Sequence, residues 1–215
     1  MKLKLKYIFI FGLLSLTYSF TAFEDSEVVS VKGRQLRIND TPYFIKGVCF
    51  NPVEKGHTER DFTNIDLDLA LMNEAGINTI RVYKPIDEVS VLDKIAAAGI
   101  KVITSFGYNQ EGHFDILTGS YLDYVNTYKS HKAILFWELG NEYNYHPEWF
   151  DGDITNWYDS LQIAADAIHQ NDPNHPVASA HGELPDSATL AASTNVDLWG
   201  LNVYRWDNPE AIFNQ

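Results

Sequence analysis

The chain has 215 residues, of which 45% are apolar and 13% aromatic, enough to bury the core of one packed domain. Acidic residues outnumber basic ones by 29 to 16, and the formal net charge is -13 at pH 7. A surface of this sign repels phosphate backbones and anionic lipids, so it argues against nucleic-acid and membrane-surface binding. Neutral sugars are indifferent to this charge, and the five Trp and 12 Tyr residues supply flat apolar faces for them.

The first 22 residues have the pattern of a secretory signal. Lysines at the start precede an apolar stretch over residues 7–16, and the small residues Ser19 and Ala22 follow it. We therefore expect residues 1–22 to direct export and residues 23–215 to form a secreted or periplasmic domain. The apolar stretch is too short for a convincing membrane-spanning helix.

Cys49 is the only cysteine, so no intrachain disulfide can form. Free cysteines are among the most often buried residues, and we expect Cys49 to be a small buried residue of a strand.

The next segment has the pattern of a β-hairpin. Alternating runs over residues 28–31 and 35–38 flank Lys32-Gly33-Arg34, and a second turn at Asn39-Asp40 leads into residues 42–45. We expect this hairpin to plug the bottom of a barrel and to lead into its first strand.

From residue 44 onward, strand patterns alternate with helical ones. The predicted strands span 44–50, 78–83, 101–106, 134–139, 176–180 and 198–204. The predicted helices lie at 66–72, 89–96, 121–128, 157–168 and 188–190. This alternation indicates a parallel α/β architecture. Asn51-Pro52 follows the first strand where a dinucleotide-binding fold would need glycines, which argues against that fold.

The fold class that fits best is α/β: a (β/α)8 TIM barrel, truncated after about six strands, with the β-hairpin at its N-terminal end. A whole barrel has eight strands and about 250 residues, whereas this sequence stops shortly after the sixth predicted strand. An open sheet is the alternative. In both cases the first and sixth strands would have unpaired edges, which favour aggregation.

The run ILFWELGNEYN over residues 134–144 carries the clearest functional pattern. A buried strand is broken at Gly140, and Asn141 and Glu142 follow where the chain leaves the sheet. A carboxylate at the carboxyl end of a parallel strand has a fixed position and an open side for substrate, as a general acid requires. The run resembles the fourth-strand motif of the retaining β-glycosidases of glycoside hydrolase clan A. Its WELxNE form is similar to β-mannanases, and its LGNE form to the β-galactosidase and β-glucuronidase group.

Other stretches resemble the same clan in the same order. Residues 44–48 are similar to its first strand, and residues 75–83 and 98–103 resemble the second and third strands of β-1,3-glucanosyltransferases and family 2 glycosidases. Residues 197–204 resemble the sixth strand. The clan carries its nucleophilic glutamate at the end of the seventh strand, so the resemblance places the nucleophile beyond Gln215.

The resemblance also implies roles for individual residues. Glu142 would be the acid/base, which protonates the departing oxygen and then deprotonates the incoming water or sugar hydroxyl. Asn141 would bind the sugar 2-hydroxyl, and Arg81 and Tyr204 would steady the nucleophile. Position, and not the resemblance, makes three further residues candidate substrate contacts: His181 at the end of the fifth strand, Asn202 on the face of Tyr204, and Trp206 just past the sixth strand.

Plainer interpretations stay open at these positions. Glu142 also fits a solvated loop acid, and Asn141 also fits a turn. Period-two alternation would place Glu138 on the same side as Glu142, and we expect Glu138 to be a structural acid paired with Arg81 or a lysine. Glu183 is a rival for the nucleophile if the chain is complete.

The predicted function is therefore a secreted retaining glycoside hydrolase that cleaves β-glycosidic bonds. A β-glucan is the favoured substrate, and β-galactosides and β-mannans stay open, as does hydrolysis versus transglycosylation. The alternative is a catalytically inactive barrel that binds glycan or is a relic. We expect a monomer with a carbohydrate substrate and with no cofactor, nucleic-acid partner or membrane partner. The seven scattered His residues lack an HExxH pattern, so we expect no metal.

Overall fold

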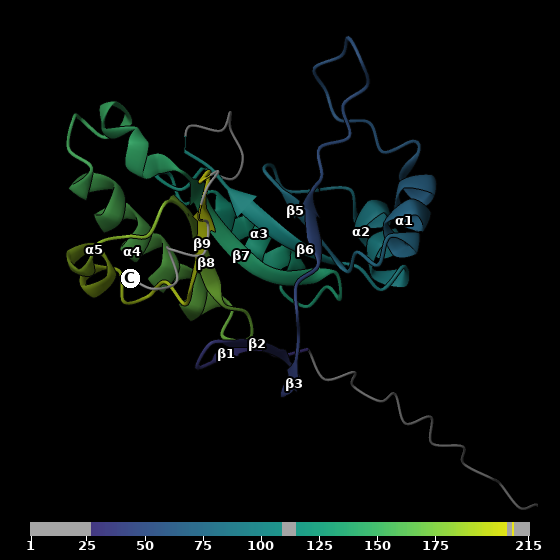
Figure 1. Cartoon of the computed structure of the whole chain (residues 1–215), viewed down its shortest axis with the longest axis horizontal. Helices are drawn as coiled ribbons and strands as arrows, with labels where there is room; N and C mark the ends of the chain where they lie inside the picture. Colours follow the sequence, from purple (N-terminus) through teal and green to yellow (C-terminus); the bar gives the residue numbers. More distant parts are fainter. Residues whose placement is uncertain (1–26, 109–114, 206–207, 209–215) are drawn as a thin grey trace, which may run out of the picture.

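Figure 1 shows the computed structural model of the chain, which describes residues 27–108, 115–205 and 208. The predicted signal and the predicted substrate contact Trp206 lie outside the described residues. A small antiparallel sheet consists of β1 (Val29–Lys32), β2 (Gln35–Ile38) and β3 (Thr41–Pro42).

The main sheet is parallel and curls into a half-barrel (Figure 1). Its strands, which pair in chain order, are β4 (Gly47–Cys49), β5 (Thr79–Val82), β6 (Lys101–Phe106), β7 (Ile134–Asn141), β8 (Val177–Gly182) and β9 (Leu198–Asn202). The helices are α1 (Ile65–Glu74), α2 (Val89–Ala97), α3 (Tyr121–Tyr128), α4 (Thr155–Asn171) and α5 (Ser187–Ala192), with 3-10 turns η1 (Tyr143–Tyr145) and η2 (Pro147–Trp149). The predicted alternation of strand and helix is confirmed. Closure into eight strands stays a prediction.

The helices cover the outer face of the main sheet with two apolar clusters. In one cluster, Ile80 and Val82 of β5 pack with residues of α1 and α2. In the other, Trp137 of β7 packs with Trp157 and Leu161 of α4, and all three side chains are at most 2% exposed. Trp157 therefore belongs to the core. No helix in the described part of the chain is both long and apolar enough to cross a membrane.

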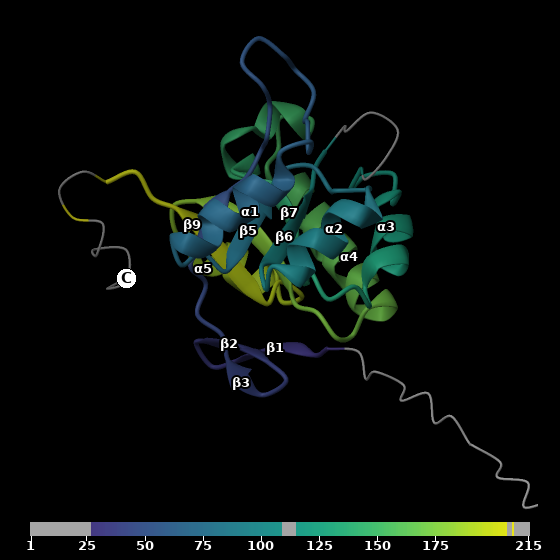
Figure 2. The same ribbon diagram turned by 90° about the vertical axis from the view of Figure 1, so that its right-hand side faces the viewer.

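The antiparallel sheet closes the amino-terminal end of the half-barrel (Figure 2). Val29 packs on Ile103 and Phe136, which line the inner face of the main sheet. The Tyr43 hydroxyl donates to the carbonyl oxygen of Asn78 at 2.8 Å, and the Val29 amide donates to the Asn174 carbonyl oxygen at 2.8 Å. The predicted hairpin is confirmed, and it packs against the inner face of the half-barrel through Val29.

The first strand of the main sheet is exposed. Among the described residues, β4 pairs with β5 and with no other strand, and the side chain of Phe44 before it is 78% exposed. Cys49 is also exposed, so the prediction that it is buried is wrong. A barrel strand is buried only when neighbours flank both of its edges, and a pattern of apolar residues does not show whether they do.

Candidate active site

The inner face of the half-barrel holds a cavity of about 330 Å³. Apolar side chains of Ile103, Phe136 and Leu198 line one part of it, and the polar side chains of Arg81, Glu138 and Asn202 line another. An apolar hollow with a few convergent polar groups is the usual form of a small-ligand site.

The polar lining of this cavity includes a buried ion pair between Arg81 and Glu138. Arg81 Nη2 lies 2.6 Å from Glu138 Oε1, and Arg81 Nε donates to both carboxylate oxygens at 2.8 and 3.0 Å. Ser105 donates a further hydrogen bond to Glu138, which is 4% exposed. Burial by itself lowers the pKa of Arg81, but the hydrogen bond and charge of Glu138 outweigh burial and raise this pKa above its ordinary value. The predicted pairing of Glu138 with Arg81 is confirmed.

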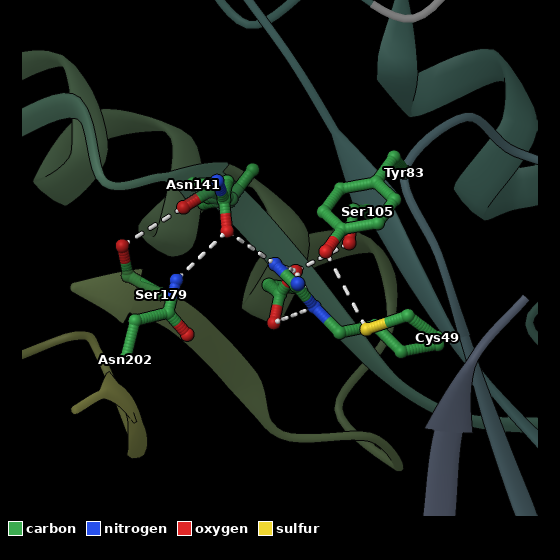
Figure 3. Close-up of polar contacts among 9 residues, drawn as sticks. Cys49, Tyr83, Ser105, Asn141, Ser179 and Asn202 are labelled. Carbon is green, nitrogen blue, oxygen red and sulfur yellow. Dashed lines mark hydrogen bonds and ion pairs between the residues drawn. The ribbon is translucent and has the colours of Figure 1, made fainter. Parts of the chain in front are cut away.

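Arg81 also holds two of the other predicted site residues in place. Its Nη2 donates to Asn141 Oδ1 at 3.0 Å, and Asn202 Nδ2 donates to the same oxygen at 3.2 Å (Figure 3). Two donors therefore bind Oδ1 of the Asn141 side-chain amide. The Nδ2 group of the same amide makes no hydrogen bond to any described residue, so it can donate to a ligand. The structure thus brings Arg81, Asn141 and Asn202 together.

A bulge in β7 makes this contact between Asn141 and Arg81 feasible. Glu138 pairs with Ala178, but Asn141 pairs with Ala180, so three steps along β7 match two along β8. In a regular strand, residues an odd number apart point to opposite faces. The extra residue changes this, so both Glu138 and Asn141 reach Arg81.

Two residues next to the bulge fit it closely. Gly140 has φ +71°, and a Cβ at this position would lie 2.7 Å from a ring atom of Trp157. On the neighbouring strand, the Ser179 hydroxyl donates to the Leu139 carbonyl oxygen at 2.8 Å (Figure 3).

Glu142 follows the bulge in a left-handed backbone conformation, with φ 56° and ψ 28°. This conformation costs about 1–2 kcal/mol for a residue other than glycine. The Glu142 amide donates to the Ala180 carbonyl oxygen at 2.8 Å, which ties its backbone to β8. Its side chain is half-buried and makes no hydrogen bond or ion pair to any residue that the structure describes.

The turn after Glu142 is clamped onto the end of β8. The Asn144 side chain accepts from the Gly182 amide at 2.9 Å and donates to the Gly182 carbonyl oxygen at 3.2 Å. Gly182 has no side chain, and a Cβ there would overlap the ring of Tyr145. Both contacts fix the position of the strand end that bears Glu142.

The other predicted site residues lie apart from the Arg81 network. His181 is 7% exposed and faces α4, where its Nε2 lies 2.9 Å from the Tyr158 hydroxyl. Its Nδ1 donates to the Glu183 carbonyl oxygen at 3.0 Å. Tyr204 lies beyond β9 with 78% of its side chain exposed. The predicted roles of His181 as a sugar contact and of Tyr204 beside the nucleophile stay predictions.

Sequence reasoning missed two features of the site. Ser105 was not singled out, although a small polar residue two positions after Ile103 in an apolar strand signals a buried polar contact. The ion pair of Glu183 with Arg205, at 2.5 Å, was missed because it joins residues 22 apart across a strand.

The sequence matches no protein-family model and no curated protein. Solved structures do match. A glycosyl hydrolase family 2 member from Bacteroides cellulosilyticus aligns with a TM-score of 0.65 and 19% identity over 86% of this chain and 25% of that one. A Faecalibacterium prausnitzii β-glucuronidase aligns with a TM-score of 0.65 and 20% identity over 86% of this chain and 32% of that one.

A third match is Bacteroides uniformis β-glucuronidase 2 covalently bound to cyclophellitol-6-carboxylate aziridine. It aligns with a TM-score of 0.60 and 17% identity over 83% of this chain and 23% of that one. The likeness is one of fold. This chain spans between 23% and 32% of the length of these three proteins.

Proposed function

We propose that this chain carries the acid/base part of a retaining β-glycosidase site, with Glu142 as the acid/base. The observation that supports this most strongly is the position of Glu142 directly after Asn141. Arg81 and Asn202 anchor Asn141 beside a concave cavity. Strained residues tend to occur at functional sites, and the left-handed backbone of Glu142 fits that tendency. The fold shared with glycoside hydrolases adds support.

In the first step of the proposed reaction, the Glu142 carboxylic acid gives its proton to the glycosidic oxygen while the bond from that oxygen to C1 breaks. A second carboxylate attacks C1 and forms a glycosyl ester. In the second step the Glu142 carboxylate takes a proton from water or a sugar hydroxyl, whose oxygen bonds to C1 and displaces the second carboxylate. That second carboxylate is expected beyond Gln215.

Asn141 would donate its Nδ2 hydrogen to the oxygen at C2 of the sugar. This bond strengthens as positive charge develops on the sugar ring, so it stabilises the transition state more than the ground state. Arg81 would be a positioning residue, because its Nη2 holds the oxygen end of the Asn141 amide and so directs the nitrogen end toward the ligand.

The proposed substrates are polysaccharides or oligosaccharides with β-glycosidic bonds. A β-glucan is favoured by the resemblance of residues 75–83 and 98–103 to glucanosyltransferases. The leader pattern at residues 1–22 supports secretion or export to a periplasm.

Turnover of aryl β-glycosides by a protein that includes this chain together with the second carboxylate, and by its Glu142→Gln variant, tests the proposal. Loss of the acid should slow a substrate with a poor leaving group by about 10²–10⁴-fold and an activated one by less. Glu148→Gln is the matched control, because Glu148 is an exposed acid in the same loop. Equal background rates from wild type and Glu142→Gln would overturn the proposal and favour a glycan-binding or relic protein.

A further inference from the structure

Glu183 has the same unusual backbone conformation as Glu142. The described chain contains five non-glycine residues with positive φ, and three of them are Asn39, Asp40 and Asp151, types that tolerate this conformation. The other two are Glu142 (φ 56°) at the end of β7 and Glu183 (φ 65°) just past the end of the neighbouring β8. Glutamate has no such tolerance, so both positions are strained at the same end of adjacent strands.

The protein holds the Glu183 backbone from two sides. Its amide donates to the Asn202 carbonyl oxygen at 3.3 Å, and its own carbonyl oxygen accepts from His181 Nδ1 at 3.0 Å. Tyr158 of α4 in turn contacts the other ring nitrogen of His181 at 2.9 Å. His181 therefore acts as a brace that fixes the conformation of Glu183.

Asn202 connects Glu183 to the proposed active site. Its backbone carbonyl oxygen accepts from the Glu183 amide, while its side chain donates to Asn141 Oδ1 at 3.2 Å. Glu183 and Asn141 are thus both hydrogen-bonded to Asn202. Asn202, which lines the cavity, therefore links the backbone of Glu183 to the side chain of Asn141.

The Glu183 carboxylate forms a two-point ion pair with Arg205. Arg205 Nη2 lies 2.5 Å from Oε2, and Arg205 Nε donates to Oε1 at 3.4 Å. The two side chains are 36% and 32% exposed, so a ligand can reach them. Ion pairs at such exposure contribute little to stability. If only stability mattered at position 183, asparagine or glycine would suit its left-handed backbone better than glutamate. We therefore interpret the ion pair of Glu183 with Arg205 as a binding feature.

We propose that Glu183 and Arg205 form a sugar-binding pair that selects neutral sugars over uronic acids. This inference rests on the proposed function of the same site. The carboxylate can accept hydrogen bonds from neighbouring sugar hydroxyls, and the guanidinium can donate to a hydroxyl oxygen. Because Glu183 already balances the charge of Arg205, a sugar carboxylate would meet an occupied cation and a repelling anion. The chain would then differ in substrate class from its β-glucuronidase fold neighbours.

The test measures binding of 4-nitrophenyl β-D-glucoside and 4-nitrophenyl β-D-glucuronide by NMR titration. Glu142→Gln is the background, so that turnover does not consume the probes. We expect the glucoside to bind at least about 10-fold more tightly than the glucuronide. Glu183→Gln removes the charge-balancing group, so the glucoside Kd should rise about 10-fold and the glucuronide Kd should fall about 10-fold. Arg205→Gln should weaken glucoside binding without any gain for the glucuronide.

Each outcome of this titration supports or overturns a specific claim. The selectivity inference is overturned if Glu183→Gln leaves the ratio of the glucoside and glucuronide Kd values unchanged. It is also overturned if the Glu142→Gln background prefers the glucuronide. Neither result affects the proposed role of Glu142 as acid/base. If neither probe binds, both the inference and the proposed function are overturned. Glu183→Asn, which suits the left-handed backbone, provides a second variant that lacks the carboxylate, and circular dichroism confirms its fold.

Discussion

Arg81 Nη2 lies 2.6 Å from Glu138 Oε1, and this contact neutralises two charges in the interior of the half-barrel. The same guanidinium reaches Asn141 at 3.0 Å. The pair is therefore both a structural element of the sheet and the support of the proposed substrate-binding amide.

Removal of the Glu138 carboxylate should destabilise the fold strongly. We expect Glu138→Ala to lower the free energy of unfolding by about 3–5 kcal/mol, because Arg81 would stay buried without its counter-charge. Urea denaturation measures this, with Glu74→Ala as a control at an exposed position that should change stability by less than about 0.5 kcal/mol. If both variants unfold at the same urea concentration, the ion pair is not structurally important.

Gly140 should tolerate no side chain. Gly140→Ala combines the cost of a left-handed alanine, about 1–2 kcal/mol, with overpacking against Trp157, about 1–3 kcal/mol. Gly33→Ala is a matched control, because Gly33 has φ +63° and open space around it, so only the first cost applies. If chemical denaturation shows the same decrease in the free energy of unfolding for Gly140→Ala and Gly33→Ala, contact with Trp157 does not constrain the bulge.

Stability and activity should oppose each other at Glu142. We expect Glu142→Asn to raise the free energy of unfolding by about 1 kcal/mol, because asparagine tolerates the left-handed region, and to abolish acid/base function. Glu142→Gln keeps the strain and should match wild type in stability. Thermal unfolding of the three chains gives the comparison, and a less stable asparagine variant would contradict the interpretation of strain.

The buried Asp172 should control stability in acid. Burial raises its pKa, but hydrogen bonds from His175 and Trp137, with the charge of His175, outweigh burial, and the pKa lies below its ordinary value. A depressed folded-state pKa contributes stability above the unfolded value of about 3.9, and this contribution disappears as the pH falls through the folded-state value.

Urea unfolding at pH values from 6 to 3 measures this contribution. We expect Asp172→Asn to lower stability at pH 6 and to flatten the decrease toward pH 3. Asp123→Asn, exposed on α3, should follow the wild-type curve. Parallel curves for the Asp172→Asn and wild-type chains would show that the acid sensitivity has another source.

The sequence by itself determined the order of elements and most of their limits. The predicted strand 101–106 and helix 121–128 have the limits observed for β6 and α3, because apolar periodicity and glycine stops are local signals. The pairing of Glu138 with Arg81 was also predictable, since a charge inside an apolar strand needs a counter-charge and few candidates exist.

Only the tertiary structure decided which side chains meet. Alternation along β7 fails at Gly140, because the bulge depends on how β7 pairs with β8, and that places Asn141 on Arg81. His181 proved to contact Tyr158 and Glu183, partners from a helix and from the next turn. Cys49 is exposed because burial of a strand depends on neighbours distant in the chain. Register, bulges and edges arise from contacts between segments far apart, so no local pattern records them.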